Sequence, residues 1–137
     1  MSQLPGDLLT YHHTGLVVKR MADSLAHYAQ VFGEDKVSQV YRIASQAVNV
    51  AFVKNGPDSY LELVEPWGEE SAAYNLLKKR ISYYHVAYKV SDIHQTLRRL
   101  EELNYKAMDV FASEAFDGRE CAFLFSPQAH LIELIQA

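Results

Sequence analysis

The sequence predicts an α+β fold built from two copies of one β-α-β-β-β module. Two observations carry this prediction. The same order of short apolar strands and one amphipathic helix occurs twice in 137 residues, and the two copies align residue by residue at a nearly constant offset. The equivalent pairs are His13 and His85 (85 − 13 = 72), Val18 and Val90, Leu25 and Leu97, and segments 61–64 and 132–135 (132 − 61 = 71). A chain of this length suits a single domain, 1–137, in which each copy forms half.

The first module is expected over about residues 11–66. After its first strand, Asp23 or Ser24 is a candidate cap for a helix that ends at Gly33. Asn55-Gly56 is a hairpin turn signal between the last two strands. The strands themselves are short and apolar, and they are expected at 13–18, 37–43, 47–53 and 60–64.

A connecting helix over about residues 69–80 leads to the second module, which is expected over about 83–136. Ser91 or Asp92 can cap its helix, and Ile93, Leu97, Leu100 and Leu103 then share one helical face. The strands of this module are expected at 84–90, 106–111, 121–125 and 131–135.

Composition excludes several classes of function. The net charge of −4 and the isoelectric point near 5.8 argue against a nucleic-acid partner, which usually meets a basic face. No apolar run approaches the roughly 20 residues of a membrane span, and the N-terminus lacks the pattern of a signal peptide. The single cysteine, Cys121, reads as a small core residue and fits a reducing compartment. A cytoplasmic protein that acts on a small molecule is therefore expected.

Each module begins with a histidine on its first strand and ends with a glutamate on its last strand. Glu62 follows His13 by 49 residues (62 − 13), and Glu133 follows His85 by 48 (133 − 85). One such residue alone is usually exposed to solvent or satisfied by structure, but four at repeat-equivalent positions are much less expected by accident. If a pseudo-two-fold axis relates the modules, two imidazoles and two carboxylates converge on it. That donor set suits one divalent Co, Ni, Zn, Mn or Fe ion, and the absence of cysteine ligands argues against a structural zinc site.

Lys89 is a candidate for substrate binding. By strand alternation it shares a face with His85 and Ala87, so its ammonium group could reach a carboxylate or phosphate of a substrate. The competing interpretation is a solvated lysine at the end of a strand.

These residues resemble the vicinal oxygen chelate superfamily, which includes the glyoxalases and bleomycin-resistance proteins, over nearly the whole chain from His13 to Glu133. Within it they resemble most the methylmalonyl-CoA epimerases. The resemblance implies a cup-shaped mixed sheet, a homodimer, and His13, Glu62, His85 and Glu133 as the four metal ligands. It rests on the segments 13–18, 60–71, 84–93 and 131–134, of which Glu65-Pro-Trp-Gly-Glu-Glu-Ser71 favours the epimerases.

The resemblance also implies a reaction, proton transfer next to the carbonyl of a thioester such as an acyl-CoA. Carboxylates serve as the bases, with Glu133 one candidate. In the epimerases another glutamate lies before the strand that carries Val50 and Phe52. Ungapped matching places Ser45 there, and a serine cannot act as that base unaided. The loop before Glu133, residues 126–130, is also shorter than the epimerase loop.

Two other functions stay open at this level. A glyoxalase I-like lyase acting on a glutathione hemithioacetal uses a similar set of ligands, and there a ligand glutamate doubles as the base. A binding protein that sequesters a drug or natural product is the alternative from another class, although such members often lose the ligands. The ring-opening dioxygenases of the superfamily use two histidines and one glutamate, so four ligands fit them less well.

Overall fold

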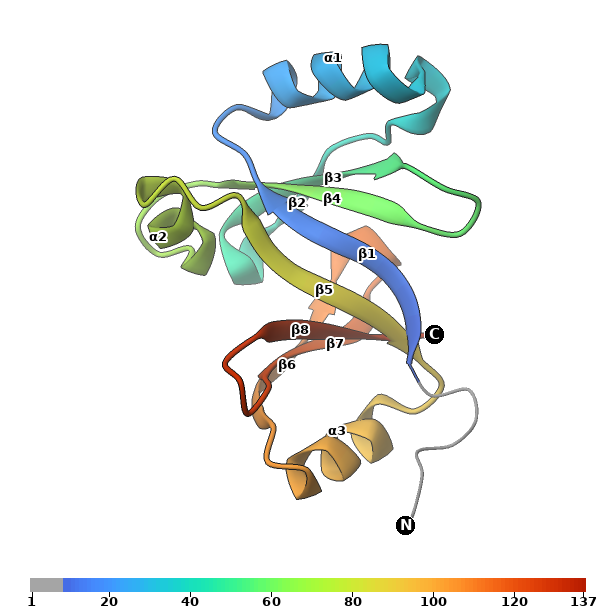
Figure 1. Ribbon diagram of the computed structural model, residues 1–137, viewed down its shortest axis with the longest axis vertical. Helices are drawn as coiled ribbons and strands as arrows, with labels where there is room; N and C mark the ends of the chain where they lie inside the picture. The colour runs from blue at the N-terminus through green and yellow to red at the C-terminus, as the bar shows by residue number, and fades with distance from the viewer. Residues whose placement is uncertain (1–8) are drawn as a thin grey trace. The chain divides into compact units, whose positions relative to one another are not determined.

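The computed structural model describes residues 9–137, and it confirms the predicted α+β class (Figure 1). Each half contributes four strands that form a mixed arrangement of parallel and antiparallel pairs. In chain order the elements are β1 (Thr10–Val17), α1 (Met21–Phe32), β2 (Tyr41–Ile43), β3 (Val48–Lys54), β4 (Tyr60–Pro66), α2 (Ala72–Lys78), β5 (Tyr83–Val90), α3 (Ile93–Glu102), β6 (Lys106–Ser113), β7 (Arg119–Phe125) and β8 (Leu131–Gln136). Short 3₁₀ turns lie at Glu34–Lys36 (η1), Ala44–Gln46 (η2) and Glu114–Phe116 (η3).

The chain divides into two compact units, one of residues 13–84 and one of residues 9–12 with 85–137. Neighbouring strands follow the order β2-β3-β4-β1 within the first half and β5-β8-β7-β6 within the second. Each half therefore has the same pairing: its first strand runs parallel to its last, and the remaining pairs are antiparallel. The repeated β-α-β-β-β order read from the sequence is present in both halves.

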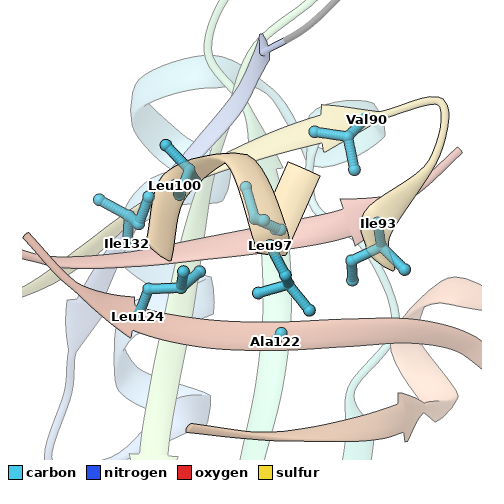
Figure 2. Close-up of a cluster of buried hydrophobic side chains, with 8 residues drawn as sticks. Val90, Ile93, Leu97, Leu100, Ala122, Leu124 and Ile132 are labelled. Atoms are coloured by element: carbon cyan, nitrogen blue, oxygen red, sulfur yellow. The ribbon is translucent and has the colours of Figure 1, made fainter. Parts of the chain in front are cut away.

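Each half has its own apolar core between its helix and one face of its strands. Figure 2 shows Ile93, Leu97 and Leu100 of α3 packed over β7 and β8. In the other half Met21, Leu25 and Tyr28 of α1 pack on Ala51, Val53 and Leu63. Because side chains alternate along a strand, the positions between these core residues point to the opposite face of each half-sheet. His13, Glu62, His85 and Glu133 occupy such intervening positions.

The start of α1 differs from the sequence prediction. The helix begins at Met21, not after Asp23 or Ser24, and its N-cap residue Arg20 makes no side-chain cap. The Glu65 carboxylate accepts the Met21 N–H instead (2.8 Å). The predicted cap of α3 is confirmed, because the Asp92 side chain accepts a hydrogen bond from the Gln95 N–H. A carboxylate far away in sequence thus replaces a local cap in the first half.

Two other bounds also differ from the prediction. The expected strand 37–43 is reduced to β2, with Val37 making only an isolated bridge to Val53. The expected helix 69–80 is α2 alone, because the Ser71 hydroxyl accepts from the Ala73 N–H and caps the helix there. Within residues 9–137, no helix combines the length and the apolarity needed to cross a membrane.

Glu65→Ala is expected to lower the free energy of unfolding by roughly 2 kcal/mol, since Glu65 accepts both the Met21 N–H and the Asn49 side-chain N–H. Glu65→Gln keeps one acceptor oxygen, so its loss should be smaller. Urea unfolding measures both. Glu69→Ala, at an exposed position after the same strand, is the control and should change little. An equal loss in Glu65→Ala and Glu69→Ala would contradict a capping role.

Candidate metal centre

The first histidine–glutamate pair lies on β1 and β4. These strands run parallel, with Gly15 opposite Glu62, so the glutamate lies two positions further along the ladder than His13 and on the same face. His13 Nε2 lies 3.4 Å from Glu62 Oε1. The exposed fractions of His13 and Glu62 are 0% and 6%, so both residues are buried.

The second pair repeats this arrangement on β5 and β8. Ala87 lies opposite Glu133, so the glutamate is again two positions beyond the histidine on the same face. His85 Nε2 lies 3.1 Å from Glu133 Oε1, and the exposed fractions are 1% and 4%. Strand pairing therefore brings together each histidine and the glutamate that the sequence repeat assigned to it.

The spacing inside each pair fits two ligands of one metal ion. First-row divalent ions bind imidazole nitrogen and carboxylate oxygen at about 2.1 Å, so neighbouring ligands lie about 3.0 Å apart at right angles and about 3.4 Å apart at the tetrahedral angle. The observed separations of 3.1 and 3.4 Å fall in that range. Nitrogen and carboxylate donors without sulfur favour Zn, Co, Ni, Mn or Fe. Each buried pair could therefore supply two ligands to a metal ion.

The other two predicted site residues, Ser45 and Lys89, are less buried than the two histidine–glutamate pairs. Ser45 is exposed on η2, between β2 and β3, whereas the pair in its own half is buried. Lys89 is half-buried on β5, on the alternation face of His85. A serine at position 45 offers a hydroxyl and no carboxylate.

Two phenylalanines beside the pairs were missed from the sequence. Phe52 packs against the His13 ring with centroids 5.6 Å apart, and Phe123 packs against the His85 ring at 5.2 Å. The repeat offset contained a usable signal, since 123 − 52 and 133 − 62 both equal 71. Apolar residues on a strand nevertheless look like ordinary core until the strand register is known.

Comparison of the sequence with known proteins identifies a family profile and a relative. Residues 12–136 match the profile of the Glyoxalase/Bleomycin resistance protein/Dioxygenase superfamily. The chain is 29% identical to "Methylmalonyl-CoA epimerase, mitochondrial" of Dictyostelium discoideum over 127 residues, which are 90% of this chain and 75% of that protein.

Two solved structures share the fold. Methylmalonyl-CoA epimerase from Mycobacterium tuberculosis superimposes with a TM-score of 0.82 at 22% identity, covering 98% of this chain and 92% of that one. A Streptomyces coelicolor methylmalonyl-CoA epimerase variant in complex with 2-nitronate-propionyl-CoA gives a TM-score of 0.80 at 23% identity, with 95% and 98% covered.

Proposed function

This chain belongs to the Glyoxalase/Bleomycin resistance protein/Dioxygenase superfamily, and from that premise we propose that it is a metal-dependent epimerase acting next to a thioester carbonyl. The observation that carries the proposal is the duplicated, buried histidine–glutamate pair with metal-ligand spacing. Its support from relatives is that the Dictyostelium protein, 29% identical, is a methylmalonyl-CoA epimerase. The substrate proposed is an acyl-CoA that carries an acidic proton beside its carbonyl.

His13, Glu62, His85 and Glu133 would together hold one divalent Co, Ni, Zn, Mn or Fe ion. When bound, that ion supplies Lewis-acid stabilisation of the negative charge that develops on the thioester oxygen. The protein keeps both pairs almost free of solvent. Exclusion of water strengthens electrostatic interactions at such a centre and limits hydrolysis of the thioester.

Glu133 is the proposed base. A carboxylate has two oxygens, so one can face His85 Nε2, as Oε1 does at 3.1 Å, while the other accepts the proton from the carbon beside the carbonyl. Lys89, on the same strand as His85, would orient a carboxylate or phosphate of the substrate. Glu133 would hold the removed proton and later release it to solvent, and a proton delivered from solvent to the other face of the enolate would give the epimer.

Exchange of the proton beside the carbonyl is the direct test. Protein loaded with each candidate metal is incubated with methylmalonyl-CoA in deuterated water, and deuterium incorporation is followed by NMR. Incorporation that needs metal and falls by about 10²-fold or more in Glu133→Gln is expected. No incorporation with any bound metal would remove the epimerase. Exchange that is unchanged in Glu133→Gln would remove Glu133 as the base.

A glyoxalase I-like lyase is the second candidate, and the observation at position 45 favours it. Ser45 is exposed and has no carboxylate, and the lyase reaction needs no base there because a ligand glutamate takes that role. Consumption of the methylglyoxal–glutathione hemithioacetal by metal-loaded protein would identify this activity. A protein that turns over the hemithioacetal and leaves methylmalonyl-CoA unexchanged would be assigned to the lyase.

Metal binding should also raise the stability of the fold. A ligand that binds only the folded state adds about 2.7 kcal/mol at a free concentration one hundred times its dissociation constant. The thermal midpoint should therefore rise with added Co²⁺ or Zn²⁺ and fall again with a chelator. Calorimetry with Ca²⁺, which prefers oxygen ligands, is the control. If no metal shifts the thermal midpoint of the metal-free protein, the alternative of a binding protein that sequesters a drug or natural product is favoured.

The predicted homodimer is a separate question, and sedimentation of the same samples measures it.

A further inference from the structure

Each histidine–glutamate pair has a phenylalanine at the same place. Phe52 on β3 lies directly opposite Glu62 on β4, and its ring meets the His13 ring at an interplanar angle of 67°. Phe123 on β7 lies directly opposite Glu133 on β8, and its ring meets the His85 ring at 82°. One aromatic side chain in each half therefore touches the imidazole and neighbours the carboxylate of its pair.

These phenylalanines are buried, with exposed fractions of 8% for Phe52 and 9% for Phe123. Within residues 9–137, they belong neither to the apolar cluster around Leu97 under α3 nor to the apolar cluster around Leu63 under α1. Strand alternation explains this, since Ala51 and Val53, on either side of Phe52, point to the helix. The phenylalanines thus pack on the face that carries the pairs.

A further layer of aromatic rings holds each phenylalanine. Phe111 stacks on Phe123 with centroids 5.8 Å apart and planes 17° apart. Tyr41 and Tyr60 make edge contacts with Phe52, with centroids 6.3 and 6.2 Å away and interplanar angles of 61° and 79°. Aromatic pairs at these distances and angles are favourable beyond the area they bury, so both phenylalanines have little freedom to move.

We propose that Phe52 and Phe123 are positioning residues that fix the two imidazoles for metal binding and keep water from the paired carboxylates. The proposal rests on the metal site proposed above. The χ2 torsion of histidine has a broad intrinsic profile, so packing must decide the plane of the ring. A nearly perpendicular ring at 5.2–5.6 Å restricts that torsion. Loss of a hydrogen-bonding neighbour that orients a ligating histidine typically changes metal affinity 10- to 100-fold, and a packed ring acts on the same orientation of the imidazole.

The experiment compares Phe52→Leu and Phe123→Leu, which keep an apolar side chain but remove the flat ring. Phe116→Leu is the matched control. Phe116 is also 9% exposed, and it meets the ring of His12, which belongs to neither pair, at 5.4 Å and 74°. Imidazole NMR signals are recorded on metal-free protein, and Zn²⁺ and Co²⁺ affinities are measured against a competing chelator. All affinities are measured below the unfolding temperature of every variant.

The expected result is a loss of affinity of about tenfold or more in each of the two variants, with a change in the imidazole signals of the histidine in that half. Phe116→Leu should change affinity less than about twofold, and Phe123→Tyr, which restores a ring, should recover most of the loss. Wild-type affinity in Phe52→Leu and Phe123→Leu would overturn the positioning role and leave the metal site standing. A wild-type protein that binds neither metal would overturn the metal site, and the positioning role with it.

Discussion

Purified His85→Ala protein is expected to hold no stoichiometric metal while it keeps its fold. His85 contributes one of four proposed ligands, and loss of a direct ligand should exceed the 10- to 100-fold cost of losing a neighbour of a ligand. The fold should survive because His85 lies outside the apolar cluster of Ile93, Leu97 and Leu100 under α3. A cost in stability of roughly 1–3 kcal/mol is expected from the altered surroundings of the buried Glu133. Elemental analysis and circular dichroism measure the two quantities.

His94→Ala is the matched control for that variant. His94 is an exposed histidine on α3 of the same half, 3.0 Å from Glu120, and it belongs to neither buried pair. Its replacement should leave the metal content at the wild-type value. Stoichiometric metal in His85→Ala, with wild-type content in His94→Ala, would contradict the ligand assignment. Loss of metal in both variants would point to a binding site elsewhere.

Ser45→Glu is expected to raise the rate of deuterium incorporation into methylmalonyl-CoA by 10²- to 10⁴-fold, the usual contribution of a positioned general base. Ungapped matching to the epimerases predicts a glutamate base at this position, where the chain has a serine. The position is exposed on the 3₁₀ turn η2, so a longer charged side chain costs little packing. NMR of the exchange reaction at saturating metal compares the variant with the wild-type protein.

Ala44→Glu adds the same charge one residue earlier in the same turn, also at an exposed position. It should leave the exchange rate unchanged, because a base must reach the proton within hydrogen-bonding distance. A Ser45→Glu rate equal to the wild-type rate would count against an epimerase that has lost its second base. In that outcome the hemithioacetal lyase becomes the better assignment, provided that metal binding is intact.

The strand 37–43 shows why a local pattern failed. Its residues are apolar enough for a strand, but only Tyr41–Ile43 form a ladder with β3. At Ser38 the backbone N–H donates to the Phe52 carbonyl, while the Ser38 hydroxyl, not its carbonyl, accepts the Phe52 N–H. A side chain that bonds in place of the backbone interrupts the ladder, and serine does this readily. Whether the backbone or the side chain of Ser38 bonds to the neighbouring strand depends on the position of that strand, which the sequence of one segment does not reveal.

The repeat shows which residues follow the last strand of each half, but it does not show what those residues do. Glu65 and Gln136 are repeat-equivalent (136 − 65 = 71), and each accepts the first N–H of its helix, from Met21 and from Ile93. In the sequence both are polar residues that directly follow the strands expected at 60–64 and 131–135. Their capping role became visible only when the strand and the helix of each half were packed together.

The order of elements, their duplication and the placement of one histidine and one glutamate on each half were determined by the sequence alone. The reason is that covalent spacing fixes which side chains alternate to the same face of a strand. The tertiary structure decided which side chains are neighbours across strands: Glu62 with Phe52, Glu133 with Phe123, and Glu65 with the start of α1. Those neighbours depend on strand register and helix docking, which contacts between distant segments settle together.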